Sequence, residues 1–453
     1  MRIHPNSFAL EEFLLSLSHE HWYVVDHLTQ CPACRKKAQS FLWMRQAPAV
    51  RRLAGALRWS PEAPDYAASL QESENIVLDH LALLKKERAE APGLFVELLK
   101  HPSAQRDLVL SNSPKFHTWG VFELLVERSL ETTPRDPDHG EELGLLALRL
   151  SEHLDADRYG AGLIEDLKAR AWAHVGNARR VKSDLRGAEE AFTSAYQHLK
   201  EGTKDTLERA ILLDLEASLR RDQRQFEDAF RLLRRAVAIF LQNNQQHRAG
   251  RSLVNMSTVH HYAGSLELGI PMLYEALDLI DPEQEPRLLL CAKHNLADDL
   301  AEASRFLEAQ KMYRETRPLY RSFPDAWTQN RRKWVKGKIV RGLGQMEQAE
   351  SLFLAARDGF LVEGIPYDTA LVSLELAVLY AEQRRTADLK RLAGEMVPIF
   401  SSLSIHREAL AALAYLMQAA EAERASLEMV RSVAAFVRRA QHDPELQFAG
   451  VGE

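Results

Sequence analysis

The sequence predicts an all-α protein whose C-terminal two-thirds is a right-handed α-solenoid of stacked helix pairs. Alanine, leucine, arginine and glutamate dominate the 453 residues, and all four favour helices. A pattern of small and large residues also recurs with a period of about 40, which is typical of repeat architectures. Long runs of β-branched residues with period two are absent, so we expect no sheet.

The repeat is carried by a small residue, a large residue four positions later and a small residue three positions after that. Such residues share one face of a helix, where small side chains let a neighbouring helix approach closely. Successive leading residues are 41 and then repeatedly 40 positions apart. The copies are Ala188–Phe192–Ala195, Ala229–Leu233–Ala236, Gly269–Leu273–Ala276, Ala309–Tyr313–Thr316, Ala349–Phe353–Ala356, Leu389–Ala393–Met396 and Met429–Val433–Phe436.

The first helix of each pair carries another small residue twelve positions before the leading one. These residues are Gly176, Ala217, Ser257, Ala297, Gly337 and Ala377. Together with the segment Trp172-Ala173-His174-Val175-Gly176, the pattern resembles the tetratricopeptide repeat family over about residues 160–440. The usual period of that family is 34, so we expect helices or turns that are longer by about six residues.

The chain divides into five predicted regions. Residues 1–45 form a small helical zinc-binding domain and residues 46–111 a helical connection with breaks at prolines such as Pro92 and Pro102. Residues 112–160 form an irregular helix pair, residues 161–440 hold the repeats, and residues 441–453 are a tail.

A Cys/His cluster lies near the N-terminus. His27 and Cys31 are four residues apart on one helix face, and Pro32 opens a turn that returns Cys34 beside Cys31. Two thiolates and one imidazole suit tetrahedral Zn²⁺, so we predict a closed structural zinc site. The alternatives are the same fold without metal and a redox Cys-x-x-Cys pair.

The segment of residues 4–45 resembles the anti-sigma-factor zinc-finger family, with its His-x3-Cys-x2-Cys signature at His27, Cys31 and Cys34. The resemblance implies a bacterial regulator and a fourth zinc ligand near the start of the first helix. We take His4 as that ligand, with His19 and His21 as rivals. A sigma factor or a signalling enzyme is the partner that this resemblance suggests.

In a tetratricopeptide superhelix the first helices line the concave face, so the register predicts which side chains face the groove. Asparagine amides there can both donate to and accept from a peptide backbone, and basic side chains suit carboxylates. We therefore expect an acidic protein or peptide partner; the alternative is a solvated face without a ligand. The predicted groove residues are His174, Asn177, Arg180, Ser218, Arg221, Arg251, Asn255, Thr258, Asn295, Arg331, Lys338 and Arg341.

The net charge of −6 gives no global reason to expect a nucleic-acid or membrane partner. No apolar run could cross a bilayer, three cysteines fit a reducing compartment, and we expect a cytoplasmic protein. Phosphate-binding loops and nucleophile elbows are absent from the sequence. The leading hypothesis is a non-enzymatic regulatory adaptor. The others are a nucleic-acid binder that uses the basic stretch 331–338 and a zinc-dependent enzyme.

Overall fold

The computed structural model describes residues 31, 34, 66–402, 407–421, 424–440 and 446–448. Every regular element in these residues is a helix, and they contain no strand, so the predicted all-α class is confirmed there. The chain divides into two compact units, Met1–Ala82 and Leu83–Glu453. All of the repeats belong to the second unit.

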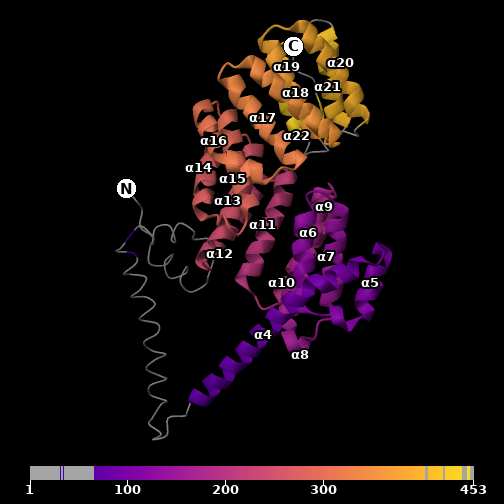
Figure 1. Cartoon of the computed structure of the whole chain (residues 1–453), viewed down its shortest axis with the longest axis vertical. Coiled ribbons are helices and arrows are strands. Elements are labelled where there is room, and N and C mark those ends of the chain that lie inside the picture. Colours follow the sequence, from indigo (N-terminus) through magenta and orange to yellow (C-terminus); the bar gives the residue numbers. More distant parts are fainter. Residues whose placement is uncertain are drawn as a thin grey trace. The chain divides into compact units, whose positions relative to one another are not determined.

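In the described residues, six elements precede the repeats (Figure 1). They are α4 (Tyr66–Leu99), α5 (Ser103–Asn112), η1 (Pro114–Phe116), α6 (Trp119–Thr132), α7 (Pro137–Ser151) and α8 (Ala156–Tyr159). Residues 112–160, for which the sequence predicts an irregular helix pair, hold α6 and α7 together with the short η1 and α8. The expected break at Pro92 is wrong, because this proline lies inside α4, whereas Pro102 does precede a helix as its N-cap.

The repeats follow as alternating first and second helices. The first helices are α9 (Ala161–Val181), α11 (Thr206–Asp222), α13 (Gln246–Tyr262), α15 (Pro286–Glu302), α17 (Ala326–Gly342) and α19 (Pro366–Glu382). The second helices are α10 (Leu185–Glu201), α12 (Phe226–Gln242), α14 (Leu266–Leu279), α16 (Phe306–Ser322), α18 (Met346–Val362) and α20 (Thr386–Ser402). Most of these helices have 17 residues, so the long period comes from long helices.

The turns inside the pairs share one geometry, which keeps the period constant. After α11 the amide of Gln225 donates to the carbonyl of Arg220 at 2.8 Å, as in a Schellman motif. The residue before it, Arg224, has a positive φ of 59°. Residues at intervals of 40 repeat this left-handed conformation, namely Gly264, Ser304, Gly344 and Arg384.

The small and large residues of the repeat form the interior of the solenoid. Ala229, Leu233 and Ala236 are buried completely, and the triplets around Phe192 and Phe353 are buried to the same degree. The packing is close where helices cross: a Cβ added at Gly337 would lie 2.5 Å from the Phe353 ring. The repeat that the sequence predicts is therefore the packing pattern of the fold.

The last helix pair departs from the pattern. In α22 (Leu427–Ala440) the buried residues are Val430, Val433, Val437 and Ala440, so the triplet expected at Met429–Val433–Phe436 has the wrong register. The helix α21 (Arg407–Glu421) packs on α20, as α13 packs on α12 and α19 on α18, whereas α22 packs on the first helix α19. The pair therefore ends the array rather than continuing it.

The buried alanines make a test of this packing possible. Ala229 is fully buried between helices, so Ala229→Trp should overpack the interface and lower the free energy of unfolding by about 1–3 kcal/mol or more. Arg231→Trp on the same helix, where the side chain is 72 % exposed, should change it by no more than about 0.5 kcal/mol. Equal urea midpoints for the two variants would contradict the register.

Candidate partner-binding face

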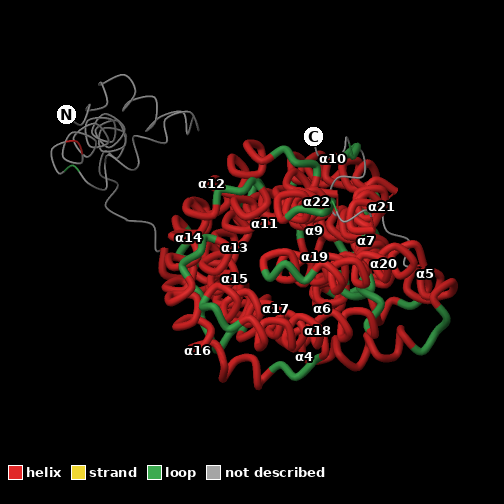
Figure 2. The backbone as a smooth tube through the Cα atoms, turned by 90° about the horizontal axis from the view of Figure 1, so that it is seen from above, coloured by secondary structure: helices red, strands yellow, loops and turns green. Residues whose placement is uncertain are grey.

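The first helices form the inner layer of the solenoid and the second helices the outer layer. Figure 2 shows α11, α13, α15 and α17 inside α12, α14 and α16 in a view from above. We call the side of the first helices that points away from the second helices the inner face. The groove residues predicted from the sequence lie on these first helices.

Arginines of the inner face form ion pairs with carboxylates of the next first helix. Arg170 of α9 pairs with Glu208 of α11, and Arg251 of α13 pairs with Glu285, which precedes α15. Arg331 of α17 lies 3.9 Å from Asp368 of α19. These cations connect successive repeats and are already compensated.

Arg180 and Arg221 share one carboxylate. Their guanidinium groups lie 2.5 and 2.7 Å from the two oxygens of Asp222, and Arg221 also lies over the ring of Tyr262. The two arginines keep the pKa of Asp222 below its usual value despite its burial. They lie on the first helices α9 and α11, but they are not the free cations that an acidic peptide would require.

A larger charged cluster lies toward the C-terminal end of the inner face. Buried Lys338 donates to Glu302 at 2.9 Å and lies 2.5 Å from Asp298. Despite the burial of both carboxyl groups, Lys338 holds the pKa of Asp298 well below its usual range and lowers that of Glu302 to about 2. Arg341 pairs with buried Glu375 at 2.7 Å, so each of these side chains has a partner within the protein.

The helix α22 adds a third cation to this cluster. Arg438 lies 2.8 Å from Glu375 and 3.3 Å from Glu302. Arg431, two turns earlier, lies 3.1 Å from Glu382, the last residue of α19. Since α22 runs along α19 in this way, it occupies the C-terminal end of the inner face.

The three predicted asparagines differ in whether their side-chain amides are still free to bind a ligand. Asn177 accepts hydrogen bonds from Arg180, and Asn255 donates to Asp214 at 3.1 Å. Asn295 is half-buried and makes no hydrogen bond to any part of the chain that the structure describes. Its amide is therefore available to a peptide backbone.

The remaining predicted residues are a histidine and two hydroxyls. His174 is buried, and burial together with the nearby Arg170 lowers its pKa to about 3. Thr258 donates to the carbonyl of Val254 in its own helix, and Ser218 is half-buried. His174 is consequently neutral near pH 7.

Two inner-face residues that were not predicted from the sequence, Arg248 and Cys291, are exposed. Arg248 of α13 is exposed and has no ion-pair partner among the described residues. Cys291 of α15 is also exposed, yet its thiol pKa is raised because the surrounding helices replace bulk water. Both could have been found by extending the helical register one further turn toward the start of each first helix.

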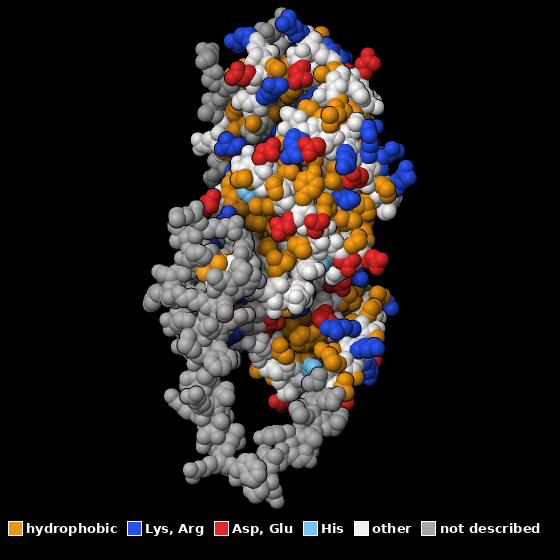
Figure 3. All heavy atoms as spheres, turned by 90° about the vertical axis from the view of Figure 1, so that its left-hand side faces the viewer, with side chains coloured by type: hydrophobic (Ala, Val, Ile, Leu, Met, Phe, Trp, Pro, Cys, Tyr) orange, Lys and Arg blue, Asp and Glu red, His pale blue; other side chains and the backbone are white. Residues whose placement is uncertain are grey.

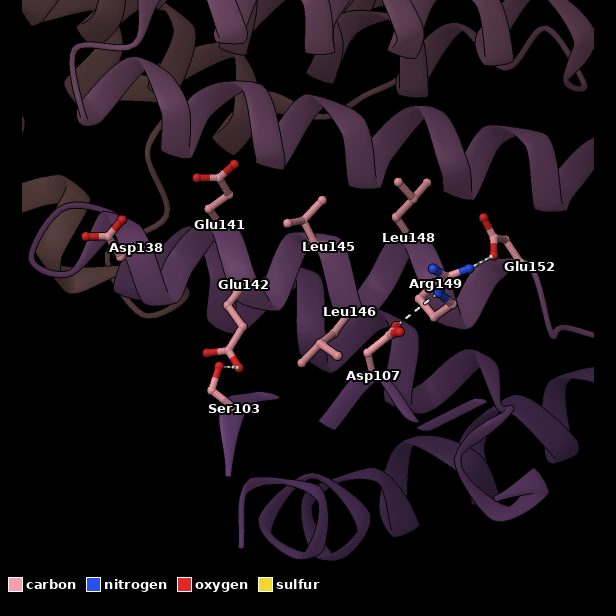
Figure 4. A pocket seen from close by; sticks show the side chains of 10 residues that line it. All are labelled: Ser103, Asp107, Asp138, Glu141, Glu142, Leu145, Leu146, Leu148, Arg149 and Glu152. Atoms are coloured by element: carbon pink, nitrogen blue, oxygen red, sulfur yellow. Dashed lines mark hydrogen bonds and ion pairs between the residues drawn. The ribbon is translucent and has the colours of Figure 1, made fainter. Parts of the chain in front are cut away.

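A pocket of about 490 Å³ lies away from the inner face, between α5 and α7. Several carboxylates line it, but they already have partners: Glu142 accepts from Ser103, and Arg149 bridges Asp107 and Glu152 (Figure 4). The pocket therefore presents no unsatisfied charge for a ligand.

The outer layer carries scattered apolar side chains. Figure 3 shows hydrophobic side chains mixed with charged ones on the face where α14 and α16 lie in Figure 1. Leu268 and Leu307, at the starts of these two helices, are strongly exposed. Nothing on this face indicates one particular partner.

The structure describes only two of the four predicted zinc ligands. Cys31 is half-buried and Cys34 is buried, whereas His4 and His27 lie outside the described residues. Among the residues that are described, no three His, Cys, Asp or Glu side chains gather so as to hold a metal ion. No described helix is long and apolar enough to cross a membrane.

Comparisons with known proteins agree with the repeat geometry. The family model of the soluble NSF attachment protein, SNAP, matches residues 169–318, which lie within the repeats. No protein with a curated description matches the sequence.

Two solved structures are similar to this chain. A Rap protein complexed with Competence and Sporulation Factor has a TM-score of 0.54 at 12 % identity, over 71 % of this chain and 87 % of that one. Aspartyl phosphate phosphatase F from Bacillus subtilis has a TM-score of 0.48 at 15 % identity, over 89 % and 96 % of the two chains. The first likeness concerns the fold alone, and with the family match it supports a tetratricopeptide-like repeat protein.

Proposed function

We propose that the chain is a non-enzymatic regulatory adaptor whose inner face binds an extended segment of a partner protein. Long concave surfaces are what stacked helix pairs use for recognition. The observation that carries the proposal is a contrast within this face. Most of its charged groups satisfy one another, whereas Asn295 and Arg248 have no partner in the described residues.

Two further points support a binding role. The family model of SNAP matches within the repeats, and a solved structure of the same fold is a complex with Competence and Sporulation Factor. The finer identity of the partner, a sigma factor or a signalling enzyme, depends on the N-terminal resemblance and is part of the proposal. The zinc held by His27, Cys31, Cys34 and His4 likewise stays a prediction.

Two observations argue against the alternative of a nucleic-acid partner. It required Trp334 to stack on a base beside free cations, but Trp334 is buried and packs edge-on against Phe360. Lys338 of the same stretch is buried in its ion-pair cluster. Trp334 and Lys338 therefore face the protein interior and are not placed to bind a nucleic acid.

A blocking substitution tests the proposed face. Asn295→Trp should lower the affinity for the native partner, identified by mass spectrometry after capture and then purified, by tenfold or more, which is about 1.4 kcal/mol. Lys311→Trp, on the exposed side of the second helix α16, is the matched control and should bind like the parent. The affinities can be measured by calorimetry. An unchanged Kd for Asn295→Trp would show that the inner face is not the site.

A further inference from the structure

The helix α22 lies across the concave side of three first helices. Its Arg438 lies 3.3 Å from Glu302 of α15 and 2.8 Å from Glu375 of α19. The helix α17 lies between these two in the array and contacts the same carboxylates through Lys338 and Arg341. A side chain that reaches both α15 and α19 passes over α17, so α22 approaches these helices from the inner face.

The direction of α22 shows that it is not a further member of the inner layer. Arg431, near its start, pairs with Glu382 at the end of α19. The hydroxyl of Tyr367, near the start of α19, donates to the carbonyl of Ala440 at the end of α22. The two helices are therefore antiparallel, whereas successive first helices of stacked pairs run parallel. The helix α22 lies on this layer as a partner helix lies in a groove.

The side of α22 that faces the array combines apolar and basic residues. Val430, Val433 and Val437 are buried, and their spacing of three and four places them on one helix face. Arg431 and Arg438 each follow one of these valines, so both arginines lie along one edge of the apolar stripe. The helix α22 is thus a basic amphipathic helix.

The surface beneath α22 has an excess of negative charge. In the described part of the chain, four of its carboxylates form ion pairs with only two cations of the first helices. The carboxylates are Asp298, Glu302, Glu375 and Glu382, and the cations are Lys338 and Arg341. Arg431 and Arg438 supply the missing positive charge. Complementary charge of this kind selects a partner, so the surface fits a basic helix.

Small side chains hold α22 in place. It buries three valines and one alanine, whereas the second helix α18 also buries four residues, of which two are phenylalanines. The side chains of Arg431 and Arg438 are 62 % and 38 % exposed, and exposed ion pairs contribute little to stability. Elements with little buried apolar surface open at the lowest free energy. We therefore expect α22 to open while the rest of the array stays folded.

We infer that α22 is an intramolecular ligand of the inner face, and that the surface beneath it binds a basic amphipathic helix of the partner when α22 is released. This inference rests on the proposed function and names the chemistry recognised at the C-terminal end of the face. The preference there is opposite to the acidic partner expected from the sequence, because carboxylates outnumber the cations of the first helices.

A peptide with the sequence of residues 426–440, labelled with fluorescein, is the probe. In the parent chain α22 excludes the peptide, because a tethered segment acts at a high effective concentration. Arg438→Glu places a carboxylate beside Glu302 and Glu375, which releases α22 and leaves the surface beneath it unchanged. We expect the peptide to bind the Arg438→Glu chain at least tenfold more tightly than the parent. Fluorescence anisotropy at low salt measures both affinities, because exposed charge pairs are screened at high ionic strength.

Two controls separate the release of α22 from a general effect of charge. Arg439→Glu makes the same charge change at the next residue, which is exposed, and this chain should bind the peptide as weakly as the parent. A peptide with glutamate in place of both Arg431 and Arg438 should not bind the Arg438→Glu chain, because its charges repel the carboxylates of the surface.

Hydrogen exchange of the parent chain tests the release of α22 without any substitution. The amides of α22 should exchange faster than those of α19, because α22 opens on its own.

Two results would overturn the inference. Equal affinity of the peptide for the parent and for Arg438→Glu would show that α22 does not cover a binding surface. Equal exchange rates of α22 and α19 would show that α22 is a permanent part of the fold, even if Arg438→Glu does not fold. The proposed function fails separately: if Asn295→Trp leaves the binding of the native partner unchanged, that function is excluded, whatever the peptide shows.

Discussion

Lys338→Met is expected to lower the free energy of unfolding by about 3–5 kcal/mol, because it leaves two carboxylates without their buried cation. Lys338 is 7 % exposed and lies 2.5 Å from Asp298 and 2.9 Å from Glu302. Methionine has a similar length and no charge, so little packing is lost with the ion pair. Urea denaturation of the full chain measures the change.

An exposed ion pair supplies the control. Lys86 is 72 % exposed and lies 3.9 Å from Glu90 one helical turn away. Such surface pairs contribute little to stability, so Lys86→Met should change the free energy of unfolding by no more than about 0.5 kcal/mol. If both variants unfold at the same urea concentration, the Lys338 cluster does not stabilise the fold.

The same cluster predicts how stability depends on pH. The folded protein holds the pKa of Asp298 and Glu302 below their ordinary values, with that of Glu302 at about 2. The unfolded chain therefore binds protons first, and the stabilisation is present above pH about 4–5 and is lost as pH falls toward 2. The loss over this interval should be smaller in Lys338→Met, where the depressing cation is gone.

The repeat could be read from the sequence because it is determined by side-chain size at helical spacing. Alanine and glycine at Ala229 or Gly337 recur where helices cross, and packing leaves no alternative there. The register failed only at α22, where spacing alone placed Met429 in the interior and Val430 is the buried residue. That helix is positioned by its contacts with α19, which lies about 60 residues earlier in the sequence.

The sequence indicates which helices form the inner face, but it does not reveal which carboxylates neutralise the arginines there. Arg180 and Arg221 lie on first helices, and their shared partner Asp222 comes from one end of α11. The carboxylates that neutralise the arginines occupy different helical positions in different repeats, so no periodic signal marks them.

The second large effect is expected from the aromatic ring at the centre of one helix crossing. Phe353 of α18 is fully buried, and its ring fills the space that a Cβ at Gly337 of α17 would occupy. Phe353→Ala should lower the free energy of unfolding by about 3–5 kcal/mol through the cavity that it leaves. Leu361→Ala, at a 37 % exposed position on the same helix, should cost clearly less.

The contact between Phe353 and Gly337 also predicts that the effect of Gly337→Ala on stability changes sign when the Phe353 ring is removed. Alone, Gly337→Ala should destabilise the protein by about 1–3 kcal/mol, because the new methyl group meets the Phe353 ring at 2.5 Å. In the Phe353→Ala background the same methyl group enters the cavity, and alanine also favours the helix by about 1 kcal/mol over glycine. Gly337→Ala should therefore stabilise the double variant. Substitutions of residues in contact have coupled effects on stability, whereas substitutions of distant residues are additive. Urea denaturation of the two single variants and the double variant measures this coupling. Additive effects would show that the two residues do not meet and that the helix register is wrong.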